Sequence, residues 1–402
     1  MAETPAARAT PGAILLLTSM VMLGQMSISL YIPSLPSLAE ALAARPEHVK
    51  LTMTLYLACF ALSQLVWGPL SDRFGRRPVL FAGIAVYLAG TLACALAPNI
   101  WALVAARGLQ GIGACVGATV SRAYTRDRFG RGDAARTLAY IGIAMALGPA
   151  LAPVLGGQLQ TWFGWRSAFL ALAFFGILVA CATYLRLEES NRNPDPHALE
   201  PRRLLGAFAT LLTSRIYLGY AMTMSGTFAG LMAYTTGIPF VFIDLFGVSP
   251  AMFGFVPTFT VIGYLSASLV ASRLAHRAVG SRLVAVGSAI CAASGIAFVA
   301  IVLAGLSNPV TVVAPMVVFM FGFGIAMPNA MANAMQPFPR IAGSAAALQG
   351  FLQMTIAAAG TVGVAALSDG TPLSTALGVC GGGLLAATGY FLLARPAEKK
   401  AA

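Results

Sequence analysis

Long uncharged stretches alternate with short charged segments along the whole chain. Ten stretches of at least 19 residues contain no Asp, Glu, Lys or Arg. A helix needs about 20 mostly apolar residues to cross the hydrocarbon core of a bilayer, so each stretch predicts at least one transmembrane helix. The ten stretches are 9–39, 51–71, 78–106, 137–165, 167–185, 216–243, 245–272, 283–339, 341–368 and 370–394.

Two further spans follow from details of this pattern. The stretch 283–339 has 57 residues, enough for two helices, and the polar Ser307-Asn308-Pro309 marks the break because proline lacks a backbone donor. Another span runs from Asn99 to Arg122 and is interrupted by one charge, Arg107. The alternating segments of about 10 residues that are typical of membrane β-strands are absent. We therefore expect an all-α integral membrane protein with twelve transmembrane helices.

The composition supports this class. Of the 402 residues, 58% are hydrophobic and 9% are charged, whereas a soluble domain usually carries about 25% charged residues. The net charge of +12 would suggest a nucleic-acid partner for a soluble protein. In a membrane protein the basic residues instead report orientation, so we expect the lipid bilayer, and no nucleic acid, as a partner.

The basic residues are distributed unequally between the two sides of the membrane. With the N-terminus in the cytoplasm, 21 of them fall on the cytoplasmic side, and Arg45, Lys50 and Arg166 fall outside. This bias predicts that both termini are cytoplasmic. Residues 11–32 are longer than the apolar region of a secretory signal, so we expect them to form an uncleaved first helix.

Residues that usually bind metals or catalyse reactions are scattered. The six cysteines lie within predicted spans without a Cys-x-x-Cys pair, and the three histidines, His48, His197 and His276, lie in separate loops. No ATP-binding motif of the form G-x-x-x-x-G-K-[ST] occurs. We therefore expect no metal, no cofactor and no enzymatic activity, and the absence of a charged pore ring disfavours a channel.

One hydrophilic segment divides the chain into two halves. Residues 188–214 combine mixed charge with three prolines, which is typical of a linker. We predict an N-terminal six-helix bundle in residues 1–187, a cytoplasmic linker in 188–214, and a C-terminal six-helix bundle in 215–402. Two similar halves favour a transporter that binds its substrate between them, near the membrane midplane.

The most specific motif follows the second predicted span. Residues 68–77 read Gly-Pro-Leu-Ser-Asp-Arg-Phe-Gly-Arg-Arg. The glycines allow close helix approach and a tight turn, and the aspartate can pair with one of the arginines. We refer to this segment as the signature loop; its six defining residues are Gly68, Asp72, Arg73, Gly75, Arg76 and Arg77.

Two more motifs lie in spans four and five. Span four contains Arg107-Gly-Leu-Gln110-Gly-Ile-Gly-Ala. Span five is rich in glycine and proline, which bend a helix and let it pack closely. The motif residues of span five are Gly148, Pro149, Pro153, Gly156 and Gly157.

Together with Tyr-Ile-Pro-Ser-Leu-Pro at 31–36 and Arg122…Arg126-Asp127 after span four, these motifs resemble the major facilitator superfamily. Within it, the chain is similar to the bicyclomycin/chloramphenicol-resistance (Bcr/CflA) group of drug:proton antiporters. The resemblance covers essentially the full length. It implies two pseudo-symmetric six-helix bundles, a monomer in the bacterial inner membrane, and export of small molecules by alternating access in exchange for protons.

The resemblance also implies roles for individual residues. In the superfamily, an acid after span four pairs with the arginines of the signature loop and latches the outward-facing state. Asp127 has that place here, so Asp72, Arg76, Arg77 and Asp127 are the expected latch. The arginine of span four couples protonation to substrate occupancy in related exporters, and Arg107 occupies its position.

Arg107 also stands out on physical grounds. It lies about eight residues into span four, which corresponds to about 12 Å of helix, and a cation at that depth costs at least about 2.5 kcal/mol. Such a residue usually faces a cavity or a partner. Because no acid within the spans offsets this cation, a neutral or anionic substrate, such as a phenicol or bicyclomycin-type compound, fits better than a cationic drug.

One feature departs from the family pattern. Related exporters carry an aspartate in span one where this chain has Ser29, and none of the thirteen acidic residues lies inside a predicted span. Three explanations are consistent with the sequence. An acid at a span boundary could titrate, with Asp127 and Asp244 the best candidates; the substrate could carry the proton or charge; or transport could be uncoupled from protons.

The lining of the cavity is predicted from polar and aromatic residues within apolar spans, since drug-sized pockets are mostly apolar with few polar groups. Gln349 and Gln353 are one turn apart and share a helix face. The candidates are Gln25, Ser29, Tyr31, Tyr56, Arg107, Gln110, Met145, Tyr234, Gln349 and Gln353.

Three functions are therefore compared. The first is proton-driven export of small molecules. The second is an uncoupled or differently coupled carrier of a metabolite or nutrient. The third, an integral-membrane enzyme, lacks the clustered catalytic side chains that it would need.

Overall fold

The structure is a computed structural model. It describes residues 10–401 except 130, 192–193, 197, 275–279 and 339–340, and within the helices it leaves out some side chains, chiefly in α6 and α11. All elements of the described part are helical.

The N-terminal half forms one group of helices, the N-terminal bundle. Span one is broken after Ser29, where a short 3₁₀ turn contains Pro33. The elements are α1 (Pro11–Ser29), η1 (Ile32–Ser34), α2 (Leu35–Ala41), α3 (Pro46–Phe74), α4 (Arg76–Ala95), α5 (Ile100–Arg128), α6 (Arg131–Phe163) and α7 (Arg166–Arg186).

The C-terminal half forms the C-terminal bundle. Its first and last spans continue from an α-helix into a π-helical turn. The elements are α9 (Arg215–Phe240), η2 (Val241–Leu245), α10 (Pro250–Phe253), α11 (Val256–Leu274), α12 (Gly280–Leu303), α13 (Pro309–Met335), α14 (Ala342–Ala366), α15 (Leu373–Thr388), η4 (Gly389–Ala394) and α16 (Arg395–Ala401).

The predicted fold class is confirmed. Among the described residues, eleven helices are long and apolar enough to cross a membrane, and the 33-residue α6 occupies the place of the remaining predicted span, 137–165. The predicted break between spans nine and ten is also found. The Asn308 side chain accepts hydrogen bonds from the backbone N–H groups of Val310 and Thr311, both at 3.0 Å, and so caps the start of α13.

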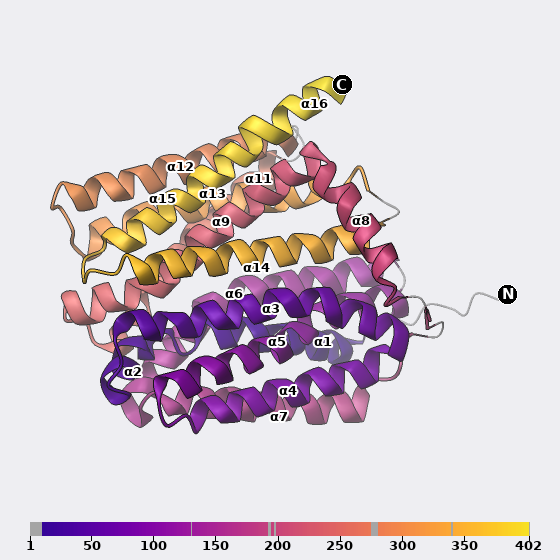
Figure 1. Cartoon of the computed structure of the whole chain (residues 1–402), viewed down its shortest axis with the longest axis horizontal. Helices are drawn as coiled ribbons and strands as arrows, with labels where there is room; N and C mark the ends of the chain where they lie inside the picture. The colour runs from indigo at the N-terminus through magenta and orange to yellow at the C-terminus, as the bar shows by residue number, and fades with distance from the viewer. Residues whose placement is uncertain are drawn as a thin grey trace.

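The predicted linker contains a helix that the sequence analysis did not expect, α8 (Pro201–Thr213). It lies across one end of the molecule (Figure 1), and its Leu211 is buried against the C-terminal bundle. The apolar run between Leu204 and Leu212 explains the helix, because a half-apolar segment at the end of a bundle gains stability by packing.

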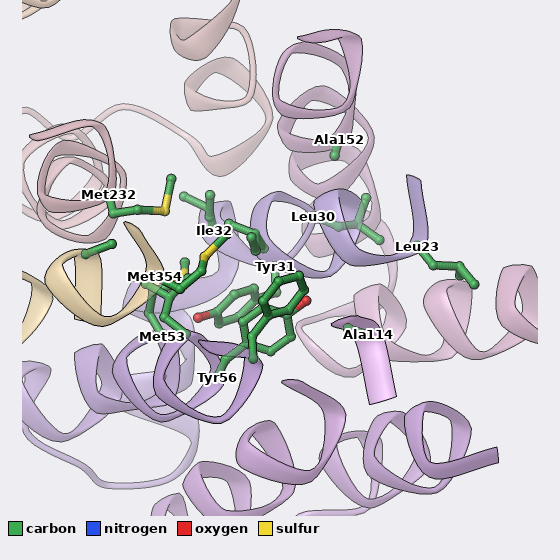
Figure 2. Packing of buried hydrophobic residues seen from close by; sticks show 14 of the residues in the cluster. Leu23, Leu30, Tyr31, Ile32, Met53, Tyr56, Ala114, Ala152, Met232 and Met354 are labelled. Carbon is green, nitrogen blue, oxygen red and sulfur yellow. The ribbon is translucent and has the colours of Figure 1, made fainter. Parts of the chain in front are cut away.

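The two bundles are in closest contact at the end of the molecule opposite α8. In Figure 1 the helices of the C-terminal bundle converge on the N-terminal bundle at that end, and most of them diverge toward α8. One buried cluster includes Met53, Met232 and Met354, from α3, α9 and α14 (Figure 2). A second cluster, around Tyr217 and Leu348, contains only residues of α8 and the C-terminal bundle within the described part.

Candidate functional site

Arg107 is enclosed inside the N-terminal bundle. It lies on α5 and is 0% exposed. Its guanidinium carbon is 4.3 Å from the ring centre of Tyr31 and 4.2 Å from that of Tyr56. Its Nη1 donates to the main-chain oxygen of Ser27 at 3.0 Å and to the amide oxygen of Gln110. Spans one, two and four therefore meet at this cation.

Further hydrogen bonds fix the residues around Arg107. The Tyr56 hydroxyl donates to the main-chain oxygen of Gly24 at 3.0 Å. The Gln110 amide nitrogen donates to the Thr91 hydroxyl at 2.9 Å, which leaves the amide oxygen to accept from Arg107. The orientation of this glutamine thus follows from the donors and acceptors around it.

Among the described residues, no carboxylate is paired with this charge. The ion pairs found in the described part of the chain do not include Arg107, and its Nε and Nη2 have no hydrogen-bond partner there. Burying an unpaired cation is costly, and two aromatic faces return only about 2 kcal/mol each when desolvated. The site therefore holds a charge with unused donors, stabilised by rings and dipoles alone.

Two other candidates lie on α1. Ser29 is buried at the last turn of this helix, and the main-chain oxygen that binds Arg107 belongs to Ser27, two residues earlier. Gln25 is half-buried, and a Cβ built on Gly148 of α6 would lie 3.1 Å from its own Cβ. The side chain of the candidate Met145 is outside the described residues.

The candidates in the C-terminal bundle are uncharged. Tyr234 on α9 and Gln349 on α14 are 3% and 4% exposed. The Tyr234 hydroxyl and both amide atoms of Gln349 have no hydrogen-bond partner among the described residues. Gln353 is half-buried one turn after Gln349.

Arg76 links the signature loop to α5. It is buried at the start of α4. Its Nε donates to a carboxylate oxygen of Asp127 at 2.8 Å, and its Nη1 pairs with Asp72 and donates to the Ser71 hydroxyl at 2.6 Å. The structure thus brings the expected latch residues Asp72, Arg76 and Asp127 into direct contact, all within one bundle.

The other signature residues have smaller roles in this arrangement. Arg73 is exposed beside Phe74, and a Cβ on Gly68 would only reach ordinary contact with Thr119 at 3.7 Å. Arg77 donates to the main-chain oxygen of Tyr184 in α7 at 3.0 Å. The loop is therefore held to α7 as well as to α5.

The sequence analysis missed two residues of this region, Glu189 and Asn191. The Glu189 carboxylate accepts the backbone N–H groups of Arg76 and Arg77, both at 2.9 Å, at the helix terminus where negative charge is favoured. The Asn191 amide donates to the main-chain oxygen of Asp72 at 2.7 Å. The linker thus caps both helices of the loop, and the available signal was an acidic pair directly after span six.

Gly75 is required at the turn for two reasons. Its φ of +98° is disfavoured for residues with a side chain. A Cβ there would also lie 2.7 Å from the Glu189 carboxylate. The glycine of the signature loop therefore makes room for the linker carboxylate.

The span-five motif lies at a contact between the bundles. A Cβ on Gly157 would be 2.5 Å from the main-chain oxygen of Pro250, and one on Gly254 would be 2.6 Å from that of Pro153. A Cβ on Gly156 would overlap the main-chain oxygen of Leu30. The motif thus lets α6 approach α10 and α1 closely; the side chain of Pro149 is outside the described residues.

No metal centre is found in the part of the chain that the structure describes: no group of three or more His, Cys, Asp or Glu residues there could hold an ion. His197 and His276 lie outside that part.

The comparison with protein families decides the family. Residues 17–361 match the model of the Major Facilitator Superfamily. The chain belongs to this superfamily. It is 31% identical to multidrug resistance protein D of Escherichia coli over 342 residues, which are 85% of each chain. It is 27% identical to a bicyclomycin resistance protein homolog of Haemophilus influenzae, covering 91% of this chain and 92% of the other.

These relatives confirm the resemblance to the Bcr/CflA group of this superfamily. A solved structure of the peptide transporter POT in complex with sulfate matches with a TM-score of 0.77 at 15% identity, covering 97% of this chain and 95% of the other. At that identity the match shows the fold alone. The protein is thus a multi-pass membrane protein of the transporter type, and transporters of this superfamily bind small-molecule substrates.

Proposed function

We propose that the protein exports small drug-like molecules by alternating access in exchange for protons. The carrying observation is that the bundles share a buried core toward one end and have separate cores at the α8 end, as a carrier open to one side does. The names of the relatives, multidrug resistance and bicyclomycin resistance, support drug-like compounds as the substrate class.

The orientation of the chain in the membrane determines from which side the substrate enters. The sequence assigns 21 basic residues to the side of the membrane that holds the N-terminus. By the positive-inside rule they support a bacterial inner-membrane protein with both termini, and the linker that contains α8, on the cytoplasmic side. The substrate then enters between the bundles from the cytoplasm. The division into residues 1–187, 188–214 and 215–402, and a monomeric state, belong to the same proposal.

Two devices would control the exchange. Arg107 would couple protonation to substrate occupancy, because its unused donors and buried charge respond to any change around Tyr31 and Tyr56. The Asp72–Arg76–Asp127 contacts order the signature loop, which would engage the C-terminal bundle when the outward-facing state is latched.

The proton carrier is proposed among acids at the span boundaries. Asp127 is bonded to Arg76, and Asp244 is exposed in the π-helical turn after α9. Asp369 fits less well, since hydrogen bonds from Thr371 hold the pKa of its carboxyl below the usual range. That shift keeps Asp369 charged and moves its titration away from neutral pH.

The test is transport by purified protein in liposomes. With a pH gradient imposed, wild-type protein should move chloramphenicol against its concentration gradient, and collapse of the gradient with a protonophore should stop this transport. Transport that only equilibrates chloramphenicol at any pH gradient would contradict proton exchange.

Transport that only equilibrates chloramphenicol would favour the uncoupled carrier. This alternative is supported by the absence of an acid within the predicted spans. An enzymatic role has no comparable support, because the superfamily and the structural neighbour are transporters.

A further inference from the structure

The seam between α3 and α14 joins the two bundles and carries polar groups at both of its ends. Near the end opposite α8, the Lys50 amine donates to the Ser368 hydroxyl, and the Thr54 and Thr361 hydroxyls are 2.7 Å apart. About 10 residues further along α3, the Gln64 amide lies against Gly350 of α14. The helices therefore run antiparallel in contact from Lys50 to Gln64, about 21 Å of helix.

Polar groups at the two ends of the seam differ in their hydrogen bonding. The hydroxyls and the amine at the Lys50 end are paired across the seam. At the other end, the Gln64 amide oxygen and both amide atoms of Gln349 are buried without a partner among the described residues. Leaving such a group unpaired in a buried place is costly, so these amides are poised to bind a molecule with matching groups.

Gly350 makes room for this arrangement. It follows Gln349 in α14, and a Cβ there would overlap the Gln64 amide. Because Gly350 has no side chain, the Gln64 side chain of the N-terminal bundle reaches the level of Gln349 in the C-terminal bundle. This level lies next to the cluster around Tyr217 and Leu348, which belongs to the C-terminal bundle, so it is at the α8 side of the shared core.

No acidic side chain is buried in the described part of the chain. The buried charged side chains of the described part are Lys50, Arg76 and Arg107, and none of them is an acid that would attract a cation. The α14 side chain Met354 and the α3 side chain Met53 add a flexible apolar wall along the same seam (Figure 2). The region thus offers neutral donors and acceptors beside an adaptable apolar surface.

We propose that Gln64 and Gln349 form a binding site for the amide group of a neutral substrate. This inference rests on the proposed export function and names its substrate class. The Gln349 oxygen accepts the ligand N–H. Its nitrogen donates to a different acceptor of the ligand, because the C=O and N–H of a trans secondary amide point in opposite directions. The Gln64 oxygen accepts a second donor, such as a hydroxyl.

The test measures binding to purified full-length protein in nanodiscs by isothermal titration calorimetry. The probes are chloramphenicol, its N-methylated amide derivative, and tetraphenylphosphonium, a cation without hydrogen-bond donors. For wild-type protein, N-methylation should weaken binding about tenfold, the effect of one lost hydrogen bond in a buried site. In Gln349→Leu this penalty should disappear, with tetraphenylphosphonium binding unchanged.

Two further variants test whether the effect is specific to the proposed site. Gln64→Leu should weaken chloramphenicol binding by a similar factor. Gln336→Leu makes the same substitution at an exposed residue directly after α13 and should leave every probe unaffected. An N-methylation penalty that is equal in wild-type protein and Gln349→Leu overturns the inference, as does equal weakening of tetraphenylphosphonium.

Liposome transport separates this inference from the proposed function. If wild-type protein exports chloramphenicol and the N-methylation penalty is independent of Gln349, the function stands and the amide site is wrong. If wild-type protein neither binds nor exports chloramphenicol, the proposed function is contradicted and the amide site with it.

Discussion

The two bundles bury different kinds of polar side chain. Every charged residue that is buried in the described part lies in the N-terminal bundle: Lys50, Arg76 and Arg107. The polar residues buried in the C-terminal bundle are Ser, Thr and Gln. Because buried charge is costly and responds strongly to its surroundings, the difference suggests that one bundle performs the coupling and the other contributes neutral recognition of the substrate.

The strongest test of this division removes the least compensated charge. Arg107→Ala should lower gradient-driven transport of chloramphenicol at least about 100-fold, because the cation between Tyr31 and Tyr56 is lost. Initial rates of uptake into liposomes measure the effect. Arg395→Ala removes an exposed arginine at the α8 end and should change the rate little; a similar loss in both variants would contradict the special role of Arg107.

The next largest effect is expected at the signature loop. Asp72→Asn should reduce transport roughly 10- to 100-fold without loss of membrane insertion, since it removes one of the two carboxylates that pair with Arg76. Transport assays and the amount of protein in isolated membranes give the two readouts. Wild-type rates in this variant would rule out the latch.

Close packing of α6 against α1 depends on the span-five motif. Gly156→Ala should lower the midpoint of thermal unfolding and slow transport several-fold, because the added Cβ overlaps the main-chain oxygen of Leu30 and such overpacking typically costs about 1–3 kcal/mol. The control is Gly363→Ala, which should be neutral because a Cβ at Gly363 meets nothing within 4 Å. Gly164→Ala is a poor control because the φ of Gly164 is +75°. Equal effects at Gly156 and Gly363 would show that the close approach of α6 is unimportant.

The smallest effect concerns the linker. Glu189→Gln should slow transport about threefold, since an amide caps the start of α4 less well than a carboxylate. Glu188→Gln breaks an exposed pair with Arg128 at 2.5 Å and should have no measurable effect. A larger loss of transport in Glu188→Gln than in Glu189→Gln would show that the cap of α4 does not influence the loop.

Much of the fold could be predicted because the bilayer imposes a simple rule on length and charge. The uncharged stretches located the spans, and the break at Asn308 was visible from its polar neighbours and Pro309. The helix α8 was missed because mixed charge and prolines, at 194 and 196 before it and at 201 where it begins, are equally typical of an irregular linker.

The site was predicted less completely. Local motifs pointed to Arg107, Arg76 and Asp127, since each lies in a recognisable spacing. The contact between Glu189 and the start of α4 joins residues 113 apart, and the meeting of Gln64 with Gly350 joins opposite bundles. Such contacts depend on how helices pack, which no pattern within one segment specifies.

Substrate exchange across the liposome membrane tests the central claim most directly, because it needs alternating access but no proton gradient. In Arg107→Ala, exchange of labelled for unlabelled chloramphenicol should continue within about threefold of the wild-type rate, a smaller effect than the loss of one hydrogen bond would have. Gradient-driven uptake should be lost in the same variant. Loss of both activities together would show that the buried cation supports the structure or the substrate site and does not couple the two fluxes.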